Sequence, residues 1–194
     1  MFPSNFCRLA LLYLSSSDKL SGLIYAEIFM NLKRSTQRTK EMSKLIYETF
    51  KGAITLGEEE SSMDFCEIIV DAKDLEKGDL MMPLCAIFGK HFVLGIVEMK
   101  EVNSKTISKM RASFIERFFE EDHKKYSNVL FDYHKELLDT GLLEAYTHYI
   151  LQVGDPHGFE EWAASLEKEL NTYFDWYLEK DNYLEVTKKN LFIN

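Results

Sequence analysis

The stretch Asp18–Leu32, DKLSGLIYAEIFMNL, decides the fold of this chain. Apolar side chains lie on almost every side of a helix drawn through it, so hardly any polar face remains. A helix that is apolar nearly all round packs against other elements on more than one side. Ser16 or Ser17 can cap its start by accepting a hydrogen bond from a free backbone N–H. We therefore predict an inner helix of a helical stack over 18–32.

Three other stretches, 40–56, 105–124 and 159–178, have the periodicity of amphipathic helices. Apolar residues recur in them at i, i+3, i+4 and i+7, which is the pattern of one buried helix face. Each stretch is therefore predicted to form a helix that packs on one side only.

Short turns divide 128–178 into three predicted helices. Gly141, after Asp139 and Thr140, can take the left-handed conformation that closes a helix. Asp155 suits an N-cap, and Pro156 suits the first helical position, where its missing N–H costs nothing. Turns this short make neighbouring helices roughly antiparallel.

The middle of the chain is ambiguous. The runs 65–70 and 91–97 are rich in β-branched residues, and period alone does not assign short apolar runs. The stretch 80–88 between them reads as a helix with Pro83 near its start. We favour helix throughout, and a small α+β region at 60–100 is the alternative.

The predicted fold class is therefore all-α, with antiparallel helix pairs in a repeat-like array or an irregular bundle. The chain has 194 residues, which is a usual size for one domain. We expect a repeat-like region at 1–100 and a helical cap at 101–194, joined in one continuous domain.

Charge and cysteine content narrow the choice of partner and compartment. The net charge of −9 opposes binding to nucleic acid or to anionic membranes. The basic residues Lys33, Arg34, Arg38 and Lys40 are interpreted as a solvated turn between helices. The three cysteines, Cys7, Cys66 and Cys85, lie in apolar runs without the spacing of a disulfide framework, which indicates reduced thiols and a cytoplasmic location.

The segment Arg8–Ala26 resembles one tetratricopeptide-type repeat. Ala10 and Tyr13 on a first helix, a turn at Ser17 and Asp18, and Gly22 and Ala26 on a second helix match that family's spacing. Small residues let paired helices approach closely while aromatic residues fill the groove between repeats. A second, fainter copy covers 53–69, with a turn at Gly57 and small residues Ser62 and Cys66 on its second helix.

The last part of the chain, from Tyr133 through Trp162 and Trp176, resembles the closing segments of some bacterial tetratricopeptide-repeat proteins. This resemblance implies a terminal helical cap with a polar outer face. The family is a scaffold for protein–protein interaction, so the resemblance implies binding rather than catalysis.

Motifs for nucleotide binding and for a hydrolase nucleophile are absent from the sequence. The sharpest metal-ligand candidates are Glu116, Glu120 and His123, because Glu120 and His123 form one E-x-x-H element and Glu116 precedes them by a turn. A di-iron helical bundle uses that element twice. A second E-x-x-H element is absent from this sequence, since Glu144 and His148 are four positions apart. We therefore interpret the three as a solvated acidic face, without a metal or other cofactor.

The predicted function is that of a protein–protein interaction module without catalytic activity. Trp176 lies off the main apolar stripe of 159–178 and is the candidate residue for partner binding. Because the repeat-like segment starts near Met1 without a capping segment, we also expect either self-association through the N-terminal helices or a missing upstream region. The alternatives are a metal-binding helical bundle or enzyme, and a small acidic adaptor or immunity-type protein.

Overall fold

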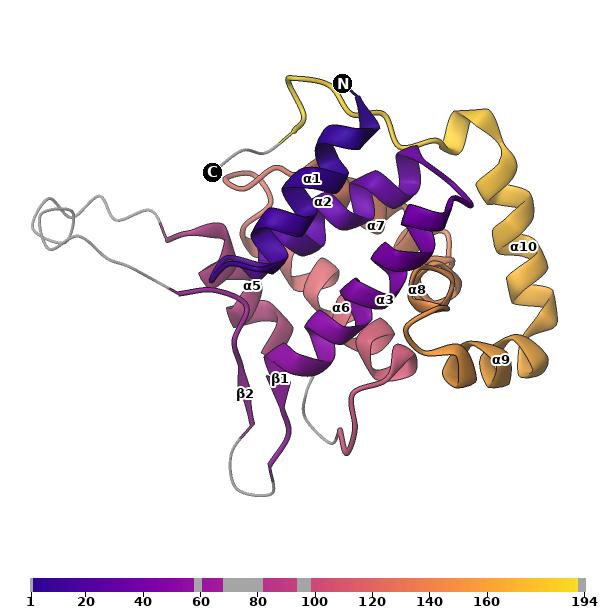
Figure 1. Ribbon diagram of the computed structural model, residues 1–194, viewed down its shortest axis with the longest axis horizontal. Coiled ribbons are helices and arrows are strands. Elements are labelled where there is room, and N and C mark those ends of the chain that lie inside the picture. The colour runs from indigo at the N-terminus through magenta and orange to yellow at the C-terminus, as the bar shows by residue number, and fades with distance from the viewer. Residues whose placement is uncertain (1, 58–60, 68–81, 94–98, 192–194) are drawn as a thin grey trace, which may run out of the picture.

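Figure 1 shows a computed structural model of the chain, which describes residues 2–57, 61–67, 82–93 and 99–191. Within these ranges the predicted all-α class is confirmed. Two short strands, β1 (Ile54–Thr55) and β2 (Ser62–Met63), pair antiparallel, and a 3-10 helix, η2, spans Lys180–Asn182. The α-helices of the described ranges are α1 (Pro3–Leu14), α2 (Lys19–Leu32), α3 (Gln37–Ala53), α5 (Leu84–Phe92), α6 (Ser104–Glu121), α7 (Val129–Asp139), α8 (Leu143–Leu151), α9 (Pro156–Ser165) and α10 (Glu167–Leu178).

Helix α2 is the inner helix that its sequence predicts. Eleven of its 14 residues are buried, and it packs against α1, α3 and α7. Its N-cap is Asp18, whose carboxylate accepts a hydrogen bond of 3.1 Å from the Ser21 N–H. The expected cap by Ser16 or Ser17 is therefore wrong. The Ser16 hydroxyl is used at the end of α1 instead, where it donates to the Tyr13 carbonyl at 2.8 Å.

Helices α1 and α2 form an antiparallel hairpin with the close approach that small residues permit. Ala10 and Ala26 are fully buried, and Tyr13 packs against Tyr25 with ring centroids 5.6 Å apart. A Cβ atom added at Gly22 would lie 2.6 Å from the Leu14 backbone nitrogen. The two helices form one antiparallel pair over Arg8–Ala26, and the repeat resemblance itself stays a prediction.

Helices α3 and α6 form most of the predicted stretches 40–56 and 105–124, although α3 ends at Ala53, where β1 follows, and α6 ends at Glu121. Each helix begins at a capping box. Thr36 and Asn103 are the N-caps, and each exchanges hydrogen bonds with a threonine three residues later. Two of the four free N–H groups at each helix start are thereby satisfied, which fixes where each helix begins.

The turns that bound α8 form as predicted. Gly141 has φ +75° and follows α7. The Leu142 N–H donates to the Leu137 carbonyl at 2.7 Å, which completes a Schellman closure. Asp155 is the N-cap of α9, and Pro156 is its first residue.

The single helix predicted over 159–178 is wrong, because two helices meet at Leu166. That residue has φ −132° and ψ 46°, outside the helical region. Figure 1 shows α9 and α10 meeting at a corner. The corner turns α10 back toward α8, so that Tyr173 and Tyr177 lie against Tyr149, with ring centroids 5.6 and 5.2 Å apart. Tertiary packing therefore overrides a local periodicity that favours one continuous helix.

The middle of the chain fits neither prediction fully. The second repeat copy at 53–69 is wrong, because Ser62 and Met63 form β2 and residues 64–67 are irregular. Helix α5 begins at Leu84 rather than at residue 80, and His91 and Phe92 belong to it. Residues 68–70 and 94–97 of the two ambiguous runs lie outside the described residues. Within the described residues of 60–100, the small α+β alternative is represented by β2, which pairs with β1 outside that range.

The expectation of three reduced cysteines is wrong for two of them. Cys66 and Cys85 form a disulfide, with Cα atoms 6.3 Å apart, whereas Cys7 is a buried free thiol as predicted. Chain folding brings together two cysteines that are 19 residues apart, and no spacing rule for small disulfide-rich domains anticipates such a single bridge.

Both predicted regions, 1–100 and 101–194, contribute to one core. Buried apolar side chains from Phe6 to Leu184 form a single contiguous cluster. Phe114 is at the centre of its aromatic part, with ring centroids 4.8 Å from Phe88 and 5.0 Å from Phe131. Helix α6 therefore connects the N-terminal and C-terminal parts of the molecule.

The predicted solvated turn lies between α2 and α3, with one exception. Lys33, Arg38 and Lys40 are exposed. The Arg34 guanidinium instead lies 3.6 Å from the Tyr177 ring centroid and 4.0 Å from the Tyr183 ring centroid. This cation–π contact fastens the segment after α10 to the α2–α3 turn.

We predict that Gly22→Ala destabilises the protein by about 1–3 kcal/mol, because the added methyl group overpacks the α1–α2 contact. Gly89→Ala is the matched control in another helix, since a Cβ atom there meets nothing within 4 Å. That control should gain about 0.4–1 kcal/mol. Urea unfolding followed by circular dichroism measures both, and a neutral Gly22→Ala variant would contradict the close approach.

Candidate functional site

The residues predicted as metal ligands do not converge. Glu116 and Glu120 are exposed on α6, which ends at Glu121 before His123 is reached. The His123 Nε2 lies 2.8 Å from Asp132 Oδ1, and the His123 ring stacks on an aromatic ring near the end of α6. The E-x-x-H spacing therefore does not place Glu120 and His123 on one helical face.

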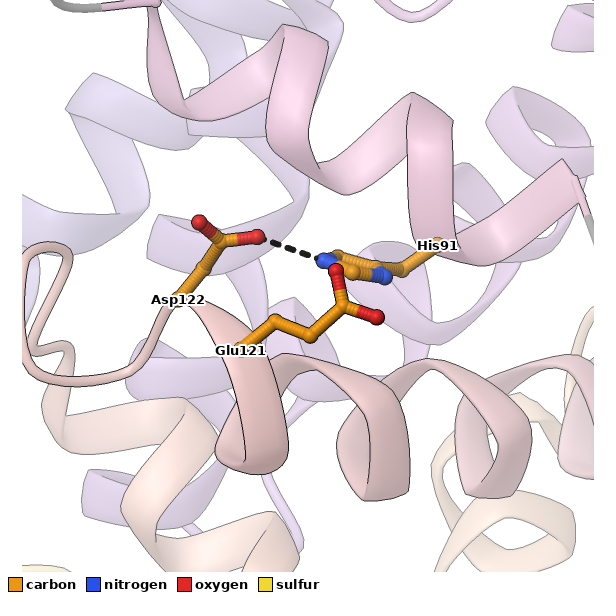
Figure 2. A group of neighbouring side chains, drawn as sticks. All are labelled: His91, Glu121 and Asp122. Atoms are coloured by element: carbon orange, nitrogen blue, oxygen red, sulfur yellow. Dashed lines mark hydrogen bonds and ion pairs between the residues drawn. The ribbon is translucent and has the colours of Figure 1, made fainter.

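A different group of potential ligands lies at the same end of α6. Figure 2 shows His91, from α5, pointing toward Glu121 and Asp122 at the end of α6. One ligand atom from each residue lies within 4.8 Å of the others, and His91 Nε2 is 2.7 Å from Asp122 Oδ2. This group joins residues about 30 positions apart, so a local motif does not reveal it.

Lys90 supplies positive charge to that group. Its Nζ lies 2.6 Å from Glu121 Oε2 and 3.5 Å from Asp122 Oδ2. The hydrogen bond to Glu121 raises the pKa of Lys90 and lowers the pKa of Glu121, while the hydrogen bond from His91 lowers the pKa of Asp122. The two carboxylates are therefore ionised, and the ammonium group offsets one of their two negative charges.

A second polar cluster lies in the core. Glu27 of α2 accepts hydrogen bonds from both terminal nitrogens of the Arg111 guanidinium, one of them at 2.9 Å. His134 Nε2 and the Tyr146 hydroxyl each lie 3.1 Å from Glu27 Oε2, and Asn31 Nδ2 donates to the Tyr146 hydroxyl at 2.8 Å. Because a carboxylate only accepts, Nε2 carries the hydrogen of neutral His134. We call these five residues the Glu27 cluster.

The electrostatics of the Glu27 cluster keep the ion pair charged. Burial alone raises the pKa of Glu27, but the charge of Arg111 and the hydrogen bond from His134 outweigh it and lower that pKa to about 2. Burial lowers the pKa of His134, although its bond to Glu27 acts in the opposite direction. The cavity beside the cluster has a volume of about 20 Å³, enough for one water molecule. The cluster is therefore enclosed and has no room for a substrate.

The sequence contains a signal for this cluster, but that signal is not part of a nucleotide-binding, hydrolase or metal-binding motif. Glu27 is the only acid between Lys19 and Leu32, a stretch that is otherwise almost wholly apolar, and Arg111 follows Ile107 by four residues on the buried face of α6. A charge at a buried helix position requires a partner of opposite charge. The identity of that partner depends on tertiary structure.

His148 of α8 is a further buried polar side chain, outside both groups. Its ring stacks on Trp162 with centroids 4.7 Å apart, and neither ring nitrogen has a hydrogen-bond partner among the described residues. Burial lowers its pKa to about 4. His148 is therefore held neutral at pH 7.

An apolar groove that is open to solvent lies between α1 and α3. It has a volume of about 570 Å³. Leu11, Leu14 and Leu45 form much of its wall, and Lys19 and Glu48 also line it. Leu11 and the adjacent Leu12 are 48% and 66% exposed, although α1 carries only one charged residue. We call this surface the α1–α3 groove.

Trp176, the residue expected to bind a partner, is half-buried. Its ring packs against Tyr133 with centroids 5.7 Å apart, and its carbonyl accepts a hydrogen bond of 2.7 Å from Asn182 Nδ2. Much of its indole surface is therefore used inside the fold.

We predict that Zn²⁺ binds the His91 group weakly, because the Lys90 ammonium already contacts both carboxylates and repels a second cation. Lys90→Met should raise the Zn²⁺ affinity at least about tenfold, equivalent to about 1.4 kcal/mol. Competition with a chromophoric chelator measures this change, and Lys135→Met, which removes an exposed ammonium from α7, is the control. Equal affinities for the wild type and Lys90→Met would contradict this role of Lys90.

We predict that stability falls as the pH drops from 6.5 toward about 4. In this window unfolded histidine binds a proton, while folded His148 stays neutral until its pKa of about 4 is reached, so acid favours the unfolded state. Glu27 adds a further loss below about pH 4.5, since its folded pKa is about 2.

His148→Phe, which keeps an aromatic ring on Trp162, should remove on the order of 3 kcal/mol of this pH dependence. His157→Phe is the control, because its side chain is 80% exposed. Urea unfolding at a series of pH values gives the slopes. An unchanged slope for His148→Phe would show that His148 is not responsible.

Comparisons with known proteins find no protein similar to this chain. No helix of the described residues is both long and apolar enough to cross a bilayer. No family model, no curated protein and no solved structure matches the chain.

Proposed function

We propose that this chain is a protein-interaction module whose α1–α3 groove docks an amphipathic helix of a partner protein. The observation that carries the proposal is the pair of exposed leucines, Leu11 and Leu12, beside an apolar hollow of about 570 Å³. Single exposed apolar residues are ordinary on protein surfaces, but adjacent ones beside a hollow indicate an interaction site.

The shape and chemistry of the groove suit a helix. Helix-in-groove recognition places apolar residues at i, i+3, i+4 and i+7 of the partner into an apolar channel between two helices. The aliphatic wall of Leu14 and Leu45 would receive such residues. Lys19 and Glu48, at the margin of the groove, are each in an ion pair within the chain, with Asp64 and Lys44 respectively.

Binding is favoured over catalysis by the state of the polar clusters. The Glu27 cluster is enclosed, and its charges are matched within the protein. In the group at His91, the Lys90 ammonium already contacts both carboxylates. A catalytic group must instead reach a substrate. The cytoplasmic location and the repeat-family resemblance stay predictions.

The test compares two exposed leucines of nearly equal accessibility on different helices. Leu12, on α1, is 66% exposed, and Leu178, at the end of α10, is 68% exposed. We expect Leu12→Glu to abolish partner binding, because it places a carboxylate on the exposed surface of α1 next to Leu11, which lines the hollow, while Leu178→Glu retains binding. Both variants should unfold within about 0.5 kcal/mol of the wild type, as surface substitutions do.

Affinity capture from native extract, quantified by mass spectrometry, provides one measurement, and sedimentation velocity over a concentration series provides the other. Proteins lost with Leu12→Glu but kept with Leu178→Glu would support a heterologous partner. A dimer that Leu12→Glu alone dissociates would identify a second copy as the occupant. Identical captured proteins and identical sedimentation for both variants would overturn the proposal.

A further inference from the structure

The disulfide between Cys66 and Cys85 joins elements that also pack together without it. Phe65, next to Cys66, packs edge-on against two rings of α5, with centroids 5.2 Å from Phe88 and 5.8 Å from Phe92. These contacts are apolar and buried, so they do not require the covalent bond. Opening the disulfide therefore leaves the aromatic contact between the two segments intact.

Backbone hydrogen bonds also hold the segment before Cys66. The Leu20 N–H donates to the Phe65 carbonyl at 3.2 Å, and the Asp64 N–H donates to the Ala53 carbonyl at 2.7 Å. Lys19 Nζ pairs with Asp64 Oδ2 at 2.7 Å. The segment is thus fixed to α2 and α3, and Cys66 stays near Cys85 when the sulfurs separate.

The two sulfurs differ in access and in surroundings. Cys66 is partly exposed, whereas Cys85 is 8% exposed. Cys85 is the second residue of α5, and the N-cap of that helix, Pro83, has no side-chain acceptor for the N–H groups of the first turn. A thiolate at a helix N-terminus is stabilised by those N–H groups and by the helix dipole. Cys66 is therefore the sulfur open to attack, and Cys85 is the better leaving thiolate.

We propose that Cys66 and Cys85 form a reversible thiol–disulfide exchange site for a low-molecular-weight thiol such as glutathione. The glutathione thiolate attacks Cys66 Sγ, and the electron pair of the disulfide leaves on Cys85 Sγ. A second glutathione thiolate then attacks the glutathione sulfur of the mixed disulfide and releases Cys66. Two glutathione thiols become glutathione disulfide, and their two protons end on Cys66 and Cys85.

The test uses folded protein in glutathione buffers of graded ratio. After acid quenching and denaturation, maleimide labelling counts free thiols, which should rise from one, at Cys7, to three on reduction. We expect this change while the circular dichroism spectrum remains that of the folded protein. Resistance to reduction until urea unfolds the chain would overturn the proposal, and so would failure of the disulfide to form in oxidised glutathione.

Single-cysteine variants test the direction of attack. With oxidised glutathione, Cys85→Ser should accumulate a mixed disulfide on Cys66, detected by intact mass and peptide mapping. Cys66→Ser should react at least tenfold more slowly, because Cys85 is buried. Equal glutathionylation of the two folded variants would contradict the asymmetry. Thiol counting in the wild type keeps the test valid if one variant does not fold.

Discussion

The buried ion pair between Glu27 and Arg111 is the constraint on which the rest of the structure depends. Two charges removed from water are tolerated only when their geometry is good and their remaining hydrogen bonds are made. The oxygens of Glu27 meet this condition with groups from α6, α7 and α8. Removing one partner of such a pair usually costs about 3–5 kcal/mol. One carboxylate on α2 thereby sets the positions of three later helices.

This arrangement explains why the apolar surface of α1 remains outside. With α6, α7 and α8 placed around the Glu27 side of α2, the hairpin positions α1 on another side through the contact at Gly22. Phe6, Cys7 and Ala10 of α1 are buried against the fold, while Leu11 and Leu12 are exposed and Leu11 lines the groove with residues of α3. The α1–α3 groove is thus a consequence of core geometry, which supports treating it as a preformed docking surface.

Local signals in the sequence predict much of the helical architecture. The apolar stretch 18–32, the capped start at Asp155 and the closing Gly141 all act within a few residues, so reading them requires no tertiary information. The corner at Leu166, the disulfide and the grouping of His91 with Asp122 depend on packing between distant segments. The sequence predicts only that the N-terminal helices self-associate. It does not predict the candidate groove, because α3 supplies the other wall of that groove.

Because the proposed contact surface is on α1, the most direct measurement is site-specific photocrosslinking in the native cell. A benzophenone amino acid is placed at position 12 and, separately, at position 178. We expect a discrete crosslinked polypeptide from position 12 and none from position 178, whether the product is a second copy or another protein. No product from position 12, or the same products from both positions, would contradict the claim that the α1–α3 groove binds a partner.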